Sequence, residues 1–406
     1  MQAAGRLDAL AQAQGMVFGL DSIKQLDRLL GSPACSLQAV HVAGTNGKGS
    51  VAGKVARSLE KAGYCTGLYT SPHLVDYTER LQIDGVAISK EEFAGIIEEG
   101  FRLRAEKGLK VTAFDLITAM SFSYFHRKQV DLAVVEVGLG GTLDSTNILT
   151  PAVSVITSIG FDHISLLGPT LAAIAMQKAG IMKAGIPVVL GPNVPISVLQ
   201  ERAKEVGSPC VLVPSAVDFE TADQENTRIA QAVLTLLKSK MGKLTSAHLN
   251  SAAEHTPFGR RQEVVLPNNA RLILDTGHNI SALSRLFYDL MHTYPAHRFQ
   301  AVMGLSADKL VYLCVEEVMK HVEKLHFVSS GYHRLLDWQE MREVGLGIDP
   351  FVVGHCGKVG DVLPKAISEL KSDEILVICG SFFIMSDVYS TLHSLNIPLP
   401  SPNSQS

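Results

Sequence analysis

Short apolar runs rich in Val, Ile and Leu alternate along the chain with longer segments whose apolar residues recur every three to four positions. The longer segments at residues 51–62 and 114–125 have the spacing of helices. We expect strands at the apolar runs of residues 37–43, 66–70, 132–137, 153–159 and 187–190. This alternation predicts repeated strand–helix–strand units and a mainly parallel sheet.

The regular pattern stops in segment 238–257, where polar and small residues indicate the approach to a linker. A second α/β pattern follows, with strands expected at residues 271–274, 299–303, 325–328 and 374–379. A chain of 406 residues is long enough to form two hydrophobic cores. We therefore expect two α/β domains and a short connection, at residues 1–257, 258–262 (the linker) and 263–406.

The run HVAGTNGKGS lies between a predicted strand and a predicted helix, which is where a phosphate-binding loop belongs. Gly44 and Gly47 permit a tight turn, so that backbone N–H groups and the start of the helix can face phosphates. Lys48 adds a positive charge, and Ser50 can meet Mg²⁺ or a phosphate oxygen. A glycine-rich turn without a ligand would explain the glycines but not Lys48 and Ser50. Gly49 departs from the common pattern, which has Ser or Thr directly after the lysine.

Polar residues also stand at the ends of three other predicted strands: Ser71, Glu136 and His163. Ligands of an open parallel sheet bind beyond the carboxyl ends of its strands, so these residues could share a site. A carboxylate inside an apolar run, such as Glu136, is costly unless it is paired or binds a metal. Mg²⁺ takes few protein ligands, and the three residues could hold one or two such ions. A lone histidine or serine at a strand end is usually a capping or core residue, and only the common placement of the three at strand ends favours a function.

The composition excludes several classes of protein. With 46% hydrophobic residues, 19% charged residues and a net charge of −4, the chain is an ordinary globular protein without the basic excess that a nucleic-acid partner requires. Its six cysteines are scattered without C-x-x-C spacing, which favours isolated thiols in a reducing compartment over disulfides or a zinc site. No apolar stretch is long enough for a membrane span and the N-terminus has no signal core, so we expect the protein to stay in the cytoplasm. We also expect a monomer.

Six sequence blocks together carry a family resemblance. They are HVAGTNGKGSV, TSPHL, VEVGLGGTLDSTN, ITSIGFDHISLLG, KAGI and DTGHN, which occur in this order and span most of the chain. Together they resemble the folylpolyglutamate synthase/dihydrofolate synthase branch of the Mur ligase superfamily. The resemblance implies an N-terminal P-loop ATPase domain with a mainly parallel sheet and a smaller C-terminal Rossmann-like domain that binds glutamate. It also implies ATP-dependent ligation of L-glutamate to dihydropteroate or folates through an acyl-phosphate.

The resemblance also implies roles for individual residues. The residues expected to bind ATP are Gly44, Thr45, Asn46, Gly47, Lys48, Gly49, Ser50, Asn226, Arg260 and Asp275, with Arg261 as an alternative to Arg260. Those expected to take part in catalysis are Lys48, Lys178 and His278. Lys178 matches the family's carbamylated lysine, which supplies a carboxylate to a second ion, although by its pattern alone it would be a helix-surface lysine. Ser71, Glu136 and His163 would ligate Mg²⁺.

For the substrates, Thr112, Phe114 and Asp144 match segments that hold the pterin, with Phe114 stacking on the ring and Asp144 accepting its hydrogen bonds. The alternative is a core aromatic ring and a turn aspartate. His278 and Ser381 would lie on the glutamate side.

Thr142 and Gln177 replace an arginine and a glutamate of the family, and the segment before Asn226 is contracted. Alternatives that remain open are a monofunctional folylpolyglutamate synthase, a cell-wall Mur ligase and a non-catalytic nucleotide sensor.

Overall fold

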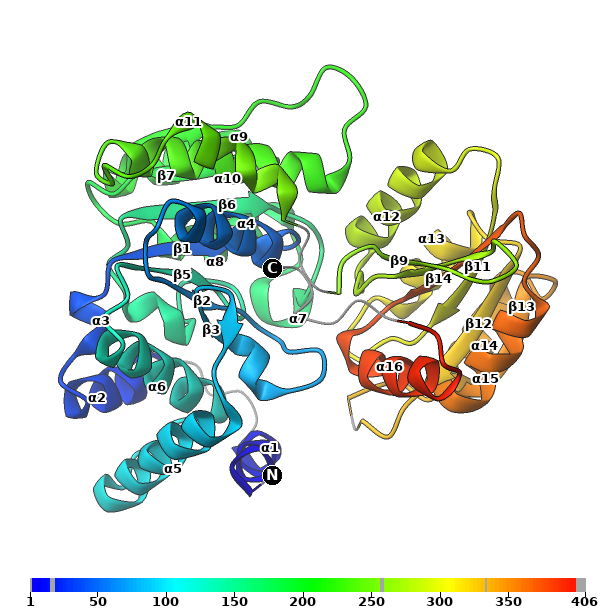
Figure 1. Cartoon of the computed structure of the whole chain (residues 1–406), viewed down its shortest axis with the longest axis horizontal. Coiled ribbons are helices and arrows are strands. Elements are labelled where there is room, and N and C mark those ends of the chain that lie inside the picture. Colours follow the sequence, from blue (N-terminus) through cyan, green and yellow to red (C-terminus); the bar gives the residue numbers. More distant parts are fainter. Residues whose placement is uncertain (1, 15–18, 256–258, 333, 399–406) are drawn as a thin grey trace. The chain divides into compact units, whose positions relative to one another are not determined.

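The computed structural model describes residues 2–14, 19–255, 259–332 and 334–398, and residue contacts divide the chain into two compact units. The first unit consists of Met1–Gly160, Leu167–Phe219 and Asp223–Thr256. The second consists of Phe161–Leu166, Glu220–Ala222 and Pro257–Ser406. Each unit contains one sheet with helices on both of its faces (Figure 1), so the α/β class expected from the sequence is confirmed.

The sheet of the first unit has the strand order β4-β3-β2-β5-β1-β6-β7-β8. All neighbouring strands pair in parallel except β2 with β3 and β3 with β4. The strands are β1 Ala39–Ala43, β2 Thr66–Tyr69, β3 Leu81–Ile83, β4 Val86–Ala87, β5 Leu132–Glu136, β6 Val153–Ser158, β7 Val188–Asn193 and β8 Cys210–Leu212. The carboxyl ends of β2, β5, β1 and β6 therefore lie along one edge, as the candidate residues require.

Eleven α-helices and four 3₁₀ turns precede residue 257 in the described part of the chain. The α-helices are α1 Gln2–Gln14, α2 Asp21–Leu29, α3 Pro33–Ser36, α4 Lys48–Lys61, α5 Lys90–Lys107, α6 Ala113–Arg127, α7 Ile164–Leu167, α8 Leu171–Lys178, α9 Ile196–Val206, α10 Ala222–Lys238 and α11 Ser246–Asn250. The 3₁₀ turns are η1 Tyr77–Arg80, η2 Ser145–Ile148, η3 Ala179–Ile181 and η4 Ser251–Glu254. Alternate strand residues point to opposite faces, so Val40 and Val42 pack with α4 and α10 while Ala39 packs with α6.

The second unit also has a mainly parallel sheet covered by helices. Its strand order is β13-β12-β11-β14-β10-β9, and only β9 is antiparallel to its neighbour. Its strands are β9 Gln262–Val265, β10 Arg271–Leu274, β11 Arg298–Met303, β12 Lys324–Ser329, β13 Val353–Lys358 and β14 Glu374–Cys379. Its helices are α12 Ile280–Thr293, α13 Val311–Met319, α14 Trp338–Ile348, α15 Val359–Glu369, α16 Met385–Ser394 and the 3₁₀ turn η5 Phe382–Ile384. Helices α12, α13 and α14 share one apolar core with the sheet.

The expected strands are all present, most with shifts of one or two residues at their ends, although β7 continues to Asn193. Helix α4 begins at Lys48 instead of residue 51, because Gly47 takes a left-handed conformation that starts the helix inside the phosphate loop. The short strands β3, β4, β8 and β9 and the six-residue strand β13 were not expected. Of the expected linker, residue 258 lies outside the described residues, and Gln262 already begins β9.

The segment expected to approach a linker instead contains α11 and η4, which pack against α4. The side chain of Lys54 on α4 has no exposed surface, and its Nζ atom donates to three groups. These are the carboxylate of Asp223 at 2.9 Å and the backbone oxygens of Ala252 and His255 at 3.2 and 2.6 Å. Lys54 on the phosphate-loop helix thus binds segment 246–255 to the first unit. The polar composition of this segment had indicated a linker instead.

Replacing Lys54 with Met should lower the free energy of unfolding by about 1–3 kcal/mol, because the buried carbonyl group of Ala252 loses its donor. Chemical denaturation measures this difference. The control Lys61→Met removes an exposed lysine of the same helix that pairs with Glu254 and should leave the stability nearly unchanged. Equal stability of the Lys54→Met protein and the wild type would contradict the structural role of this lysine.

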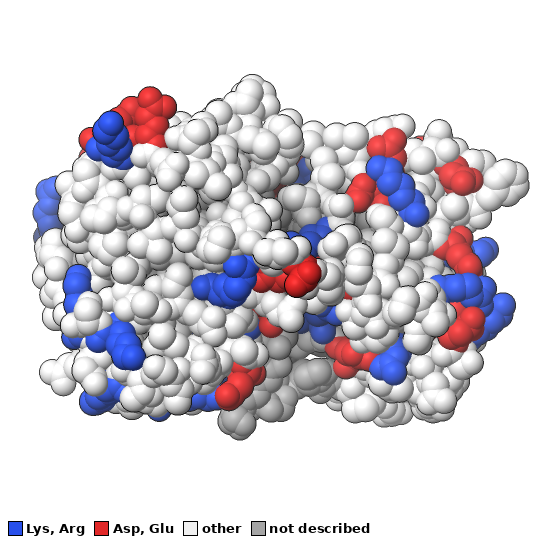
Figure 2. Space-filling model, turned by 90° about the horizontal axis from the view of Figure 1, so that it is seen from above, with Lys and Arg blue, Asp and Glu red and all other residues white. Residues whose placement is uncertain are grey.

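The surface shows no field of a single sign on the face drawn in Figure 2, where Lys and Arg side chains lie interspersed with Asp and Glu. None of the helices in the described part of the chain has the length and apolarity needed to span a bilayer.

Candidate functional site

The phosphate loop begins directly after β1, and its glycines are required by both conformation and space. Gly44 and Gly47 have positive φ angles of 151° and 83°. A Cβ atom at Gly44 would lie 1.9 Å from Oγ1 of Thr157, and one at Gly47 would lie 2.4 Å from Oδ1 of Asn226. Asn226, expected on the adenine side, therefore lies against the end of the loop, where α4 begins. Any side chain at these two positions would displace the loop.

The loop is fastened to the end of β6. The backbone N–H of Thr45 donates to the Ser158 carbonyl at 2.8 Å, and that of Asn46 donates to Oγ of Ser158 at 3.0 Å. The hydroxyl of Thr157 donates in turn to the Asn46 carbonyl at 2.6 Å. Because these two N–H groups bind Ser158, we infer that phosphates are met by the first turn of α4, where Lys48 and Ser50 lie.

Glu136 and Ser71 are brought together beside this turn. The backbone N–H of Ser71 donates to Oε2 of Glu136 at 3.0 Å, and Glu136 is only 6% exposed. A Cβ atom at Gly49 would lie 3.3 Å from the same oxygen, so any side chain after Lys48 would press on this carboxylate. No cluster of three His, Cys, Asp or Glu side chains suited to a metal occurs among the described residues. One carboxylate beside a serine fits Mg²⁺, which keeps waters and phosphate oxygens as ligands.

The loop that carries Ser71 is shaped by Glu79 and Arg80. The carboxylate of Glu79 accepts the backbone N–H groups of residues 74, 75 and 76 at 2.7, 2.8 and 2.7 Å. Arg80 donates from Nε to Nδ1 of His73 at 3.0 Å. Burial lowers the pKa of His73 to about 3, and the charge of Arg80 acts in the same direction. His73 therefore stays neutral and serves to hold the loop.

Lys178 is not the helix-surface lysine that its pattern alone indicated. It ends α8 with 5% exposure, and its Nζ atom donates to the carbonyl of Gly44 at 2.8 Å. Two departures from the family pattern meet beside it, since the N–H and hydroxyl of Thr142 both donate to the Gln177 carbonyl, at 2.9 and 3.0 Å. The structure thus brings Lys178 to the phosphate loop, whereas Thr142 fastens the following segment to α8.

The expected pterin residues lie around the segment 138–147. Thr112 caps α6 by accepting from the N–H of Asp115 at 3.1 Å. The ring of Phe114 covers Gly138 so closely that a Cβ atom there would lie 2.4 Å from Cζ. Asp144 accepts from the N–H groups of Leu139 and Thr146 at 2.8 and 3.0 Å and also from the Thr146 hydroxyl.

Burial raises the pKa of Asp144, and its hydrogen bonds act in the opposite direction. The geometry therefore matches the alternative of a turn aspartate, which shapes the segment facing Phe114.

In the second unit, Asp275 organises the residues expected near ATP. It accepts from Arg260 at 3.3 Å, from the N–H of Arg261 at 3.1 Å and from the N–H of Gly277 at 2.7 Å. The guanidinium of Arg260 also lies 5.6 Å from the ring centroid of Phe382. Arg260, not Arg261, thus directs its side chain at Asp275.

The residues expected on the glutamate side are fixed locally. Nδ1 of His278 lies 2.8 Å from the Thr276 carbonyl, and its Nε2 lies 3.4 Å from Oδ2 of Asp162. Burial lowers the pKa of His278, while the hydrogen bond with Asp162 raises it in part. Ser381 is 3% exposed and its hydroxyl accepts the N–H of Phe383 at 3.1 Å, which caps η5.

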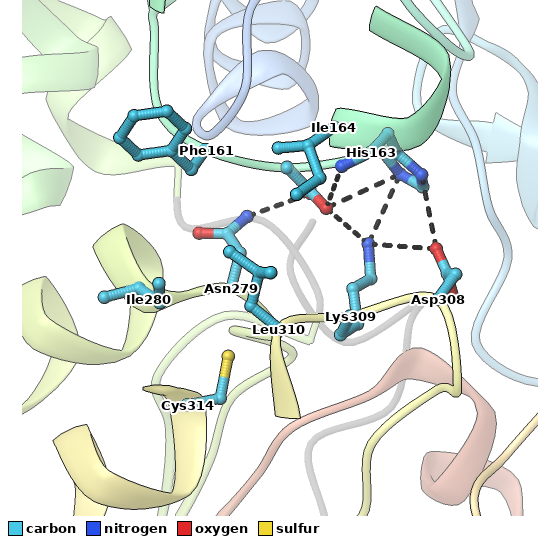
Figure 3. Close-up of a pocket in the computed structure, with 10 residues that line it drawn as sticks. Phe161, His163, Ile164, Asn279, Ile280, Asp308, Lys309, Leu310 and Cys314 are labelled. Atoms are coloured by element: carbon cyan, nitrogen blue, oxygen red, sulfur yellow. Dashed lines mark hydrogen bonds and ion pairs between the residues drawn. The ribbon is translucent and has the colours of Figure 1, made fainter. Parts of the chain in front are cut away.

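A small pocket of the second unit gathers charged side chains (Figure 3). Lys309 lies 2.6 Å from Oδ1 of Asp162 and 3.3 Å from Nε2 of His163. Nδ1 of His163 lies 3.3 Å from Asp308, and this hydrogen bond is the main cause that lowers the pKa of Asp308 to about 2. Burial alone would raise the pKa of Asp162, but the bond to His278 and the neighbouring positive charges keep it well below its usual range.

Sequence reasoning missed Asp162 as a centre of this cluster and missed Asp308 and Lys309 entirely. Asp308 and Lys309 follow the strand expected at residues 299–303. Ligands bind beyond the carboxyl ends of parallel strands, so this position could have indicated them as site candidates in the second sheet as well. His163 groups with the second unit and pairs with Asp308, whereas Ser71 and Glu136 belong to the first.

Comparisons with known proteins agree with this geometry. The model of the Mur ligase middle domain matches residues 42–211. The dihydrofolate synthase/folylpolyglutamate synthase of Bacillus subtilis (strain 168) is 30% identical, over 93% of this chain and 96% of the relative.

Two solved structures are also similar over nearly their whole length. E. coli FolC in complex with DHPP and ADP has a TM-score of 0.87 and 26% identity, over 97% of this chain and 98% of that one. A bifunctional folylpolyglutamate synthase/dihydrofolate synthase with Mn, AMPPNP and L-glutamate bound has a TM-score of 0.83 and 27% identity, over 96% and 98%.

Replacing Gly44 with Ala should weaken the binding of a non-hydrolysable ATP analogue at least tenfold, because the added methyl group overlaps the hydroxyl of Thr157 and shifts the loop. Isothermal titration calorimetry measures the affinity. Gly63→Ala is the matched control, since Gly63 also has a positive φ angle but has open space around it. Wild-type affinity in the Gly44→Ala protein would show that this loop does not bind the nucleotide.

Proposed function

This chain belongs to the dihydrofolate synthase/folylpolyglutamate synthase family, and on that premise we propose that it joins L-glutamate both to dihydropteroate and to reduced folates. It is an ATP-dependent ligase of folate metabolism. The observation that carries the proposal is the phosphate loop fastened to β6, with Lys48 and Ser50 at its helix and the carboxylate of Glu136 beside Gly49.

The chemistry follows from the poor reactivity of a carboxylate toward amines. The γ-phosphoryl group of ATP is first transferred to the substrate carboxylate, which gives an acyl-phosphate and ADP. The amine of glutamate then attacks the acyl carbon and loses a proton, and the C–O bond to the phosphoryl group breaks. Inorganic phosphate leaves with the electron pair of that bond, and the amide forms. Lys48 would hold the phosphates, and Arg260 in its contact with Asp275 would supply a second positive charge.

Glu136 and Ser71 are the residues of the first unit that would hold a divalent cation, and His163 is proposed as a further ligand. When bound, the ion neutralises charge on the phosphate oxygens. In the described structure His163 pairs with Asp308, so a role as ligand requires it to exchange that partner.

We further propose that the residues before 257 bind ATP and the pterin substrate, with Thr112, Phe114 and segment 138–147 facing the pterin. Residues 263–406 would bind glutamate through His278 and Ser381. A monomer in the cytoplasm remains our prediction, and the molar mass in solution tests the first part.

Lys178 is proposed to be carbamylated in the working enzyme. The support for this proposal is that Lys178 is buried and lies beside the phosphate loop, with its Nζ atom 2.8 Å from the Gly44 carbonyl.

Mutation of Lys178 to Ala should reduce ligation strongly, and added short-chain carboxylates should restore part of it, because they can replace the carbamate. Phosphate release in the presence and absence of acetate measures the rescue. Lys204→Ala, an exposed lysine of α9, is the control and should neither lose activity nor respond to acetate. Full activity of the Lys178→Ala protein would count against the modification.

Purified protein should release phosphate with glutamate plus dihydropteroate and also with glutamate plus tetrahydrofolate. Release with tetrahydrofolate alone would leave a monofunctional folylpolyglutamate synthase. Release only with a nucleotide-linked muropeptide would indicate a cell-wall ligase, and no release with any acceptor would indicate a sensor.

Replacing Asp144 with Ala should lower turnover of dihydropteroate roughly ten- to a hundredfold, because the N–H groups of Leu139 and Thr146 lose their acceptor at a cost of about 1–3 kcal/mol. Turnover of tetrahydrofolate should fall less if folates bind in a separate pose. Steady-state kinetics with each acceptor separates the two effects, and unchanged dihydropteroate turnover would remove this segment from the pterin site.

A further inference from the structure

A buried chain of hydrogen bonds connects β1 with the segment proposed to face the pterin. Nε2 of His41, in the middle of β1, lies 2.8 Å from Oγ1 of Thr146, whose hydroxyl donates to Oδ1 of Asp144. His41 and Thr146 have no exposed surface, and Asp144 is 6% exposed. The same strand ends at Ala43, directly before the phosphate loop. One strand therefore reaches both the nucleotide loop and this segment.

The direction of each hydrogen bond follows from the available protons. Oδ1 of Asp144 accepts the backbone N–H of Thr146 at 3.0 Å, so the Thr146 hydroxyl uses its single proton to donate to this oxygen. The hydroxyl oxygen must then accept from His41. His41 is consequently the tautomer that carries its proton on Nε2.

The other ring nitrogen shows that His41 is not placed here for packing. Within the described residues, Nδ1 of His41 is buried and has no hydrogen-bond partner. A buried acceptor without a partner is costly, and an apolar side chain at this position would avoid that cost. What the histidine supplies, and a leucine would not, is the bond to Thr146.

The far end of the chain fixes the backbone beside Phe114. Oδ2 of Asp144 accepts the N–H of Leu139 at 2.8 Å, and the neighbouring Gly138 is the residue that the ring of Phe114 covers. Loosening Thr146 would therefore release the turn that forms this surface. Other contacts hold the later part of the segment, since Asn147 donates to the Thr142 carbonyl at 3.0 Å and Ser145 donates to Asp115 at 2.6 Å, so the part that depends on Thr146 is the turn at Gly138 and Leu139.

We propose that His41 is a positioning residue that holds segment 138–147 for the pterin-bearing substrate through Thr146 and Asp144. The substrate named here rests on the proposed function, whereas the hydrogen-bond chain rests on the geometry alone. His41 touches no reacting atom in this scheme. Its effect should appear in the KM of the pterin substrate and not in that of ATP.

The test compares His41→Leu, His41→Gln and Thr146→Val. We expect His41→Leu to raise the KM for dihydropteroate roughly three- to tenfold, while the KM for ATP stays within about twofold. His41→Gln keeps an N–H donor and should recover most of the loss. The double variant His41→Leu/Thr146→Val should have the same KM for dihydropteroate as Thr146→Val alone, because both substitutions break the same series of hydrogen bonds. Hydrogen exchange at Leu139 should be faster in His41→Leu, and the ¹⁵N shifts of His41 in the wild type should report a proton on Nε2.

His326→Leu is the matched control, because His326 is equally buried but lies in the second unit and bonds to Gln300. It should lower stability and leave both KM values unchanged. An unchanged dihydropteroate KM in His41→Leu, or a His41→Gln protein as impaired as His41→Leu, overturns the proposal. If the wild type ligates no glutamate, the proposed function fails, and unchanged exchange at Leu139 then still overturns the positioning role.

Discussion

Gly44 lies so close to the end of β6 that even a methyl group in its place would overlap the hydroxyl of Thr157, and the proposed nucleotide site depends on this contact. The closeness comes from the parallel pairing of β1 with β6, which brings the carboxyl ends of both strands to one level. Ser158 then takes the first N–H groups of the loop, and the carbonyl of Gly44 is left to face Lys178. The loop is positioned by its neighbouring strand as much as by its own glycines.

Glu136 also bears on the residue that follows Lys48. A serine or threonine there would place its Cβ atom 3.3 Å from the carboxylate of Glu136, a tight contact that Gly49 avoids. Ser50 remains one position further along the helix. A carboxylate this close to the phosphate loop therefore leaves little space for a side chain after Lys48.

The parallel sheets, the phosphate loop and the meeting of Ser71 with Glu136 could be predicted because strand periodicity and the strand-end rule depend on local sequence. The burial of Lys54 and Lys178 could not be predicted, because nothing in a helical pattern tells a buried lysine from an exposed one when its partners are carbonyls distant in sequence. Only the family resemblance pointed to Lys178 as a site residue. The resemblance assigned Asp144 to the pterin, whereas in the structure its carboxylate accepts backbone N–H groups and caps a turn. Short polar residues serve backbone and ligand equally well, and sequence alone does not separate the two.

Asp162 and the backbone of Ala222 come from chain segments far from residue 257, yet they belong to the second unit. Asp162 holds Lys309 and Asn279, and the N–H of Ala222 donates to the buried carboxylate of Asp289 at 2.8 Å. The second unit is therefore not a module that could be excised at one point. A chimera that exchanged only residues after 257 with a relative would inherit foreign partners for these charges, so compatible exchanges have to include the short segments 161–166 and 220–222.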